Sequence, residues 1–318
     1  MTPNPAFLMG VNLPWIRYGQ DFGANAWQPE GGLHAAGRRA ALDEACARIA
    51  DAGLDAVRWF VLCDGRAGLV EDTSGLVRGI DDSVRRDLDV ALDALQAHRL
   101  RAIFVLVDFL LCEPAQVVGG VQVGGRRHVV TRADDRERFL DNVIAPLVAH
   151  AGAAHEVLAW DAINEPEWVT FAERTWRFWR AVPADAMRLF IAGIVGRVHA
   201  VGAKATVGLA SAHGLDLVRG LGLDLYQVHW YEQVVGRAAL TRMADDYGLD
   251  APLLLGEYAS AGSSCPSSDV LWLARVGGYA GALAWSLLAD DAYSSREACL
   301  DELVACRAMW GAPNDTAV

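Results

Sequence analysis

Residues Trp160 to Trp168 read WDAINEPEW, and they continue an apolar run that begins at Val157. The run 157–164 is typical of a buried β-strand, and the acid, amide and proline after it are typical of the loop where such a strand ends. Three carboxylates, Asp161, Glu165 and Glu167, fall within seven residues there. Because an unpaired buried carboxylate is costly, this strand end needs partners from elsewhere in the chain.

Seven further runs of this kind alternate with longer helical stretches, and together they predict the architecture. Segment 83–97 illustrates a helix, since its apolar residues recur at helical spacing on one face. The predicted strands are residues 7–13, 56–62, 101–109, 157–164, 204–210, 225–231, 253–258 and 281–288. The predicted helices are residues 37–52, 82–98, 134–150, 170–201, 213–220, 236–248, 269–277 and 295–310.

Eight strands that alternate with eight helices predict parallel strands joined by crossovers. In a chain of 318 residues this count favours an α/β fold of the (β/α)8 TIM-barrel type, as a single domain over residues 1–310 with a flexible tail, 311–318. Two long loops, 14–35 and 110–133, follow strands, so they are expected on the face where barrel enzymes carry their sites. The glycine pattern in 110–133 predicts a β-hairpin.

Composition excludes several classes of function. A net charge of −12 disfavours nucleic-acid binding, and the chain has no apolar span long enough for a transmembrane helix. The first residues lack the features of a signal peptide, which predicts a cytoplasmic protein unless a signal was trimmed. The six cysteines show no metal-ligand spacing and are expected to be reduced. Neither a metal nor an organic cofactor is predicted, and the oligomeric state is left open.

A second carboxylate gives the strand end at 164 a partner. Glu257, in LLLGEYAS, lies at the end of the seventh predicted strand, and Glu165 lies at the end of the fourth. These strands face one another across the mouth of an eight-stranded barrel. Two opposed carboxylates suit glycoside hydrolysis, in which one protonates the glycosidic oxygen and the other attacks the anomeric carbon.

The motifs AINEPEW and LLGEY on these two strands resemble clan A of the glycoside hydrolases, and the chain is most similar to its family 5, the cellulase-like family. The resemblance implies that Glu165 is the general acid/base and Glu257 the nucleophile of a retaining mechanism. It implies that Asn164 contacts the sugar 2-hydroxyl. The implied substrate is an oligosaccharide, a polysaccharide or a smaller β-glycoside.

Further strand ends carry the same resemblance. VRWF places Arg58 where the family has an arginine beside the nucleophile, and VHWYE supplies His229 and Tyr231. ALAWSLL supplies Trp285, the tryptophan under the first sugar subsite, with an expected cis peptide bond to Ser286. Arg58 and Tyr231 are expected to favour the charged form of Glu257.

Other positions depart from the family or extend it. Asp108 stands where the family usually has a histidine at the end of strand three. Asn12 or Trp15 is expected on the donor side of the site, and the aromatic residues Trp27, Trp168 and Trp230 are candidate sugar platforms.

Local geometry raises one further question. Side chains alternate along a strand, so Asn164 and Glu165 share a site only if the strand breaks there. Pro166 predicts such a break, with Glu165 in an extended conformation before it. Asp161 is expected to fix the barrel interior, and Glu167 to be a loop charge or substrate contact.

Other functional classes are either disfavoured or left open by the same residues. A serine hydrolase is disfavoured because G-x-S-x-G is absent, and a metal-dependent barrel because His229 alone is too little. A catalytically inactive carbohydrate-binding barrel and a transglycosylase stay open. The sequence leaves the sugar undetermined among glucan, mannan and smaller β-glycosides, as well as endo against exo action.

Overall fold

The computed structural model describes residues 7–170, 181–295 and 298–310, and these form a barrel of parallel strands. The main sheet has the order β10-β11-β12-β13-β1-β2-β5-β8-β9. Its two outermost strands, β9 (Ala205–Thr206) and β10 (Gly208–Leu209), are consecutive pieces of one interrupted strand, so they close the barrel at eight positions. The others are β1 (Leu8–Asn12), β2 (Ala56–Phe60), β5 (Arg101–Val105), β8 (Val157–Asp161), β11 (Tyr226–Trp230), β12 (Leu253–Ala259) and β13 (Gly281–Trp285). The predicted barrel is confirmed.

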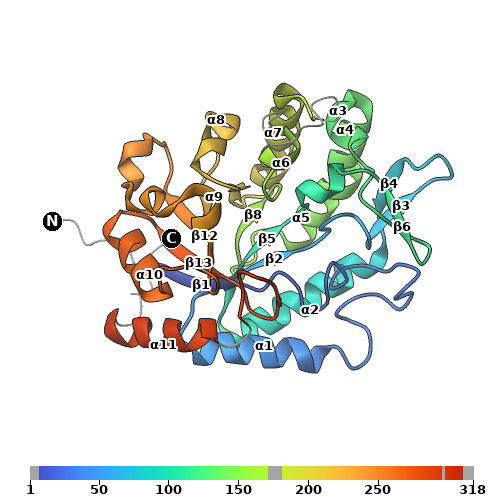
Figure 1. Cartoon of the computed structure of the whole chain (residues 1–318). Helices are drawn as coiled ribbons and strands as arrows, with labels where there is room; N and C mark the ends of the chain where they lie inside the picture. The colour runs from blue at the N-terminus through green and yellow to red at the C-terminus, as the bar shows by residue number, and fades with distance from the viewer. Residues whose placement is uncertain (1–6, 171–180, 296–297, 311–318) are drawn as a thin grey trace.

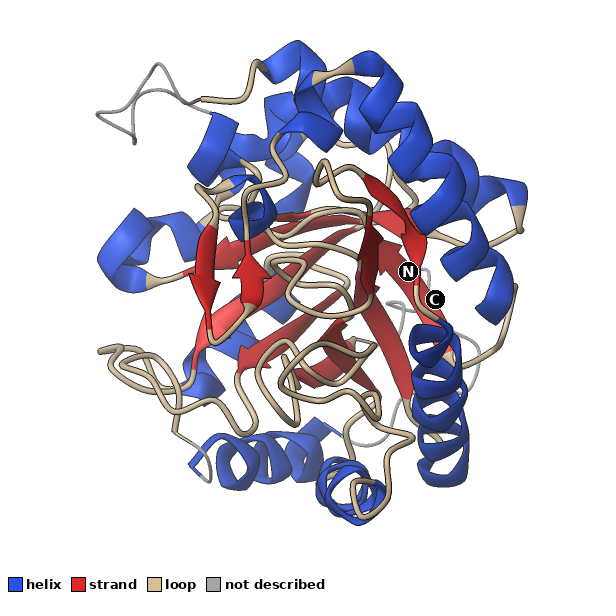
Figure 2. Ribbon diagram, turned by 90° about the vertical axis from the view of Figure 1, so that its right-hand side faces the viewer, coloured by secondary structure: helices blue, strands red, loops and turns tan. Residues whose placement is uncertain are grey.

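Helices surround these strands (Figures 1 and 2). The longer ones are α1 (Arg39–Asp51), α2 (Asp82–His98), α7 (Ala184–Ala200), α10 (Ser267–Val276) and α11 (Ala298–Trp310). One crossover combines α4 (Ala133–Phe139), a π-helical turn (Leu140–Ile144) and α5 (Ala145–Ala151). Short helices are α3 (His128–Thr131), α6 (Glu167–Thr170), α8 (Leu215–Val218) and α9 (Glu232–Val235). Turns of 3-10 helix are η1 (Phe109–Cys112), η4 (Ala212–Gly214), η5 (Arg237–Thr241) and η6 (Ala244–Tyr247).

Aromatic side chains fix the packing of neighbouring strands. Trp59 on β2, Phe104 on β5 and Trp160 on β8 are fully buried. Their rings contact in series, with centroid distances of 6.2 Å and 5.4 Å. Burying each large apolar side chain contributes about 2–3 kcal/mol, so this row stabilises the strands that carry the site at their carboxyl ends.

Three predicted elements differ from the structure. The strand 204–210 is interrupted at Val207, between β9 and β10. The helix 236–248 is replaced by η5 and η6, because the backbone of Arg242 and Met243 between them is extended. Within the described residues, the helix expected over 170–201 is α7, which follows Pro183; residues 171–180 lie outside the described part.

The loops contain two hairpins. The predicted hairpin in 110–133 is confirmed as β6 (Gln116–Val118) and β7 (Val121–Val123). A second hairpin, β3 (Leu69–Glu71) and β4 (Val77–Ile80), follows strand β2 and was missed, because its strands are short and mostly exposed or half-buried. The predicted tail 311–318 lies outside the described residues, and the single-domain division stays a prediction.

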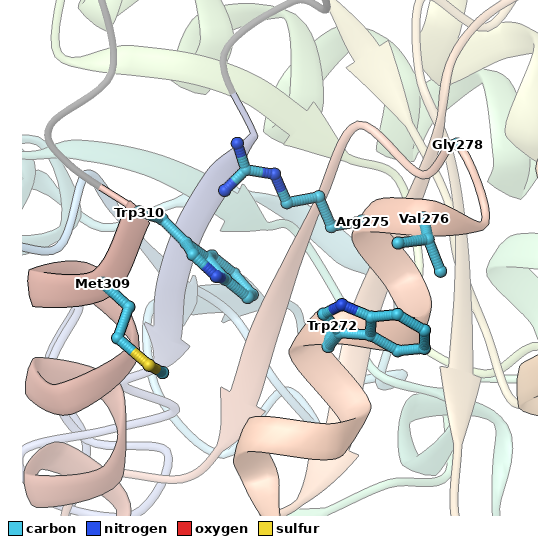
Figure 3. A pocket seen from close by; sticks show the side chains of 6 residues that line it. All are labelled: Trp272, Arg275, Val276, Gly278, Met309 and Trp310. Atoms are coloured by element: carbon cyan, nitrogen blue, oxygen red, sulfur yellow. The ribbon is translucent and has the colours of Figure 1, made fainter.

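Away from the carboxyl ends of the strands, α10 and α11 border a surface pocket (Figure 3). Its lining comprises Trp272, Arg275, Val276, Gly278, Met309 and Trp310. The Arg275 guanidinium lies over the Trp310 ring at 4.8 Å, and Trp310 also packs edge-on against Phe7. Because Phe7 directly precedes β1 and Gly278 lies between α10 and β13, this pocket is near the amino ends of the strands.

The described residues contain neither a membrane-spanning helix nor a disulfide among their free cysteines. No helix in them has the length and apolarity needed to cross a bilayer. Five of the six cysteines are free and buried, namely Cys46, Cys63, Cys112, Cys265 and Cys306. The predicted cytoplasmic location stays a prediction.

Candidate active site

Arg58 organises the floor of the candidate site. Its side chain is fully buried at the middle of β2, and each of its five N–H groups has an acceptor. Nε and Nη2 donate to Oδ2 of Asp161, Nη2 also donates to Asn164, and Nη1 donates to Asn12 and to Oε1 of Glu257 at 2.6 Å. The guanidinium therefore links β2 to residues of β1, β12 and the end of β8.

Asp161 is the structural anchor that the sequence predicted. Besides Arg58, it accepts from the backbone N–H of Gly208 at 3.0 Å and from the side chain of Gln227 at 3.2 Å. Burial lowers the pKa of Arg58, but Asp161 and Glu257 outweigh that effect and raise it above its ordinary value. The guanidinium thus stays charged although it is removed from water.

Asn12 belongs to the same floor. It is fully buried, and its Nδ2 donates to the carbonyl oxygens of Gly256 at 2.9 Å and Ala284 at 3.4 Å, while its Oδ1 accepts from Arg58. The expectation that Asn12 lines the donor side is wrong, because its polar atoms are all bonded to protein below the site. It positions Arg58 instead.

Glu165 has a left-handed backbone, with φ of +46°. The predicted extended conformation is therefore wrong, although the predicted break in the strand is present. The backbone N–H of Glu165 donates to Gly208 at 2.7 Å, which links the turn to the neighbouring strand. Positive φ at a residue with a side chain costs on the order of 1–2 kcal/mol, and here it allows Asn164 and Glu165 to reach one site.

The carboxylate of Glu165 is held from both sides. Its Oε2 accepts from the indole N–H of Trp168 at 2.7 Å, and its Oε1 lies 2.8 Å from Nδ1 of His229. Burial lowers the pKa of His229 to about 4, so its imidazole is neutral at physiological pH. Trp168 is a predicted sugar platform, and its indole nitrogen is bonded to the Glu165 carboxylate.

Glu257 lies opposite, on β12. The Tyr231 hydroxyl donates to its Oε2 at 2.7 Å, and Arg58 donates to its Oε1. A β-bulge at Gly256 puts Glu257 directly beside His229 in the register of β11 and β12. Burial raises the pKa of Glu257, and Arg58 and Tyr231 oppose that rise. The expected contacts from Arg58 and Tyr231 are present, but the effect of burial on the pKa of Glu257 is larger than theirs.

The two glutamates converge on His229. One oxygen of Glu165, one oxygen of Glu257 and one ring nitrogen of His229 all lie within 4.8 Å of one another. Retaining glycosidases have carboxyl groups about 5–5.5 Å apart, whereas inverting ones need about 6.5–9.5 Å to admit a water molecule. An oxygen of Glu165 within 4.8 Å of an oxygen of Glu257 agrees with the retaining arrangement.

Asp108 has a specific partner in the site. Its Oδ2 accepts from Nδ2 of Asn164 at 2.8 Å, and its Oδ1 accepts from the backbone N–H of Leu110, where it caps η1. Burial raises the pKa of Asp108 to about 7. In place of a histidine, this position therefore supplies an acceptor that fixes the Asn164 amide between Asp108 and Arg58.

Aromatic side chains gather where β1 and β13 end. Trp15 packs edge-on against Trp285 at 6.2 Å and against Tyr18 at 4.4 Å. The Trp285 indole donates to Asp291 at 3.0 Å, and the peptide bond between Trp285 and Ser286 is cis, as predicted. Trp15 and Trp285 thus form one aromatic group at the ends of β1 and β13.

The other two candidate platforms differ from this pair. Trp27 is 38% exposed and lies in the first long loop, with the Arg66 guanidinium 5.9 Å from its ring. Trp230 is 2% exposed, and its indole donates to the carbonyl of Gly236. The expectation of a sugar platform at Trp230 is wrong, because its ring belongs to the core behind β11.

Sequence reasoning missed three features. Glu167 is 4% exposed, so it is neither a loop charge nor a free substrate contact, and burial raises its pKa to about 7. Gly208 and Gly256 leave space for polar side chains: a Cβ at Gly208 would lie 2.4 Å from Nη2 of Arg58, and one at Gly256 would lie 2.7 Å from Gln227. The only signal in the sequence for these two glycines is that they lie on the fifth and seventh predicted strands.

Comparison with known proteins supports the resemblance. No family model matches the chain. A mannan endo-1,4-beta-mannosidase of Mytilus edulis is 23% identical over 88% of this chain and 83% of its own length. One of Cryptopygus antarcticus is 24% identical, over 91% and 84%. The crystal structure of an endo-1,4-beta-mannanase from Eisenia fetida covers 96% of this chain and 92% of its own, with a TM-score of 0.80 and 21% identity. The predicted resemblance to cellulase-like glycoside hydrolases is confirmed.

Proposed function

We propose that this chain is a retaining β-glycoside hydrolase that cleaves β-1,4-linked mannan within the polymer. The observation that carries the mechanism is the convergence of Glu165 and Glu257 to within 4.8 Å at the ends of opposed strands. The mannan substrate and the endo action rest on the names of the two relatives, which align over most of both chains.

In the first step, Glu257 attacks the anomeric carbon while Glu165 protonates the departing glycosidic oxygen. A covalent glycosyl-enzyme forms, and the proton leaves Glu165 with the aglycone. Arg58 and Tyr231 bind the two oxygens of Glu257, which orients the carboxylate for attack. Trp168 and His229 hold the Glu165 carboxyl group toward the same centre.

In the second step, Glu165 acts as a base. It takes a proton from water, and that water attacks the anomeric carbon from the face opposite Glu257. The product keeps the β configuration, because the centre has been inverted twice. Transfer to a second sugar in place of water would make the same enzyme a transglycosylase, so the two activities differ only in the acceptor.

Substrate contacts follow from the surrounding residues. Asn164 is fixed by Asp108 and Arg58, so its amide is oriented before a sugar binds. We assign it the 2-hydroxyl of the sugar at the reacting centre. Trp285, with Trp15 packed against it, provides the aromatic surface for that sugar ring.

Paired rescue experiments test the assignments. With an activated aryl β-mannoside, Glu257→Ala should lose at least about 1,000-fold in turnover, and azide should restore it with the α-glycosyl azide as product. Azide should rescue Glu165→Ala with the β-glycosyl azide, because the glycosyl-enzyme still forms. Turnover like wild type in either variant would contradict the roles.

Product analysis tests the substrate. Mannohexaose should be cut at internal bonds and soluble mannan should lose viscosity early, whereas cello-oligosaccharides of the same length serve as the control. Release of mannose alone would indicate exo action. Binding of mannan without any cleavage by the intact protein would favour the inactive carbohydrate-binding barrel.

A further inference from the structure

A nitrogen and two carboxylate oxygens converge between β8, β11 and β12. Nδ1 of His229 lies 2.8 Å from Oε1 of Glu165 and 3.4 Å from Oε2 of Glu257. An imidazole with two carboxylates is a donor set that divalent transition metals bind in proteins. Among the described residues these three side chains bring one ligand atom each to within 4.8 Å of the others.

We infer that Glu165, His229 and Glu257 form a chelating site for a divalent transition metal ion, for which Zn²⁺ is the probe. The bound ion would inhibit hydrolysis, because it occupies oxygens of both carboxylates that the reaction uses. The binding site rests on geometry alone, whereas the inhibition rests on the proposed function.

The two distances from Nδ1 of His229 are close to those around a tetrahedral ion, and the oxygens of Glu165 and Glu257 lie at most 4.8 Å apart. Zn–N and Zn–O bonds of about 2.0–2.1 Å at tetrahedral angles separate the ligand atoms by about 3.4 Å. The distance from His229 to Glu257 is already 3.4 Å, whereas that from His229 to Glu165 has to lengthen by roughly 0.6 Å. Glu165 can supply this adjustment, because its side chain is 16% exposed whereas those of His229 and Glu257 are at most 5% exposed.

Both carboxylates present an oxygen to the His229 ring nitrogen, and carboxylate oxygens are ligands that divalent cations accept. Arg58 bonds to Oε1 of Glu257, and this leaves Oε2 on the side of His229.

Tyr231 is compatible with a bound ion. Its hydroxyl donates to Oε2 of Glu257, and a carboxylate oxygen has a second lone pair for a metal. Three protein ligands leave one tetrahedral position for water, as in sites where zinc keeps an open position. Mg²⁺ and Ca²⁺ require six or more oxygen ligands, so they should bind far more weakly here.

Calorimetric titration of the full chain with Zn²⁺ tests binding without any measurement of activity. Wild type should bind one Zn²⁺ at this site, and both Glu165→Gln and His229→Asn should weaken it at least ~10-fold. His199→Asn is the matched control, because His199 pairs with Asp224 at 2.8 Å on the surface and offers the alternative site. Unchanged affinity in Glu165→Gln, or loss in His199→Asn, would overturn the inference.

Two further measurements separate this inference from the proposed function. Thermal melting shows whether each variant is folded, and Glu165→Gln decides the result if His229→Asn does not fold. Zn²⁺ should inhibit mannan hydrolysis competitively and EDTA should reverse it. If mannan is not hydrolysed while the titration succeeds, the function fails and the site stands; hydrolysis without Zn²⁺ binding gives the opposite result.

Discussion

At the scale of single residues, the structure turns a set of motif positions into one hydrogen-bonded network. All five N–H groups of Arg58 donate within this network. The Asn164 amide accepts from Arg58 and donates to Asp108. In such a network the loss of one partner affects the orientation of the others, because buried polar groups left without partners are costly.

Asp108 gives the sharpest test of this coupling. Asp108→Ala should lower kcat/KM on mannan by roughly 10-fold, since it leaves the buried Asn164 amide donor without its acceptor, which costs about 1–3 kcal/mol. The loss should fall mainly on kcat if Asn164 acts in the transition state. Steady-state kinetics measure it, with Asp93→Ala on the exposed face of α2 as the control. Equal kinetics in both variants would refute the positioning role.

Sequence predicted the residues of the site better than their conformations. These residues come together because each lies on a barrel strand or just after one, and the strand pattern can be read from the sequence: Arg58, His229 and Glu257 lie on strands, and Asn164 and Tyr231 follow them. The left-handed backbone of Glu165 could not be predicted from the sequence. Pro166 indicates only the local preference for an extended residue before it, whereas the bond to the carbonyl of Gly208 determines the turn. Burial at Glu167 and Trp230 likewise depends on distant segments.

At the scale of elements, a buried acid on α2 holds the first long loop. Asp87 is fully buried, and it accepts from the backbone N–H groups of Gly23, Gly32 and His34 and lies 2.5 Å from Nδ1 of His34. These partners lie 53 to 64 residues away in sequence, which is why the sequence did not reveal them. The loop they anchor also carries Trp15 of the site.

Loss of this anchor should loosen the loop. Asp87→Ala should destabilise the protein by about 3 kcal/mol, because several buried N–H groups lose their acceptor. It should also speed trypsin cleavage after the exposed Arg17. Urea unfolding and limited proteolysis measure the two effects. Asp89→Ala on the same helix, which breaks an exposed pair with His150, should cost less than about 1 kcal/mol.

At the scale of the whole molecule, buried carboxyl groups should make stability depend on pH. Burial raises the pKa of Asp108 and of Glu167 to about 7, and that of Asp21 to about 6. In the unfolded chain these groups titrate near pH 4. Between those values the folded protein binds more protons than the unfolded chain, so the free energy of unfolding falls as pH rises from about 4 to about 7.

Glu167→Gln isolates one share of this effect. A neutral glutamine cannot titrate, so the variant should lose on the order of 3 kcal/mol of the pH dependence that wild type shows across this window. Urea unfolding at pH 5 and pH 8 measures the difference, and Glu44→Gln on the exposed side of α1 is the control. The same slope in wild type and Glu167→Gln would show that this carboxyl group is already ionised at pH 5.

The interrupted strand that closes the barrel restricts which codon can stand at position 208. At Gly208 a Cβ would lie 2.4 Å from Nη2 of Arg58, 2.9 Å from Oδ2 of Asp161 and 3.0 Å from Nε2 of His229. Any side chain at this position would clash with these three groups, which their hydrogen bonds hold in place. In a library that varies this codon and is selected for growth on mannan, every survivor should encode glycine, whereas the codon for Gly196 on α7, where a Cβ meets nothing within 4 Å, should tolerate alanine and serine.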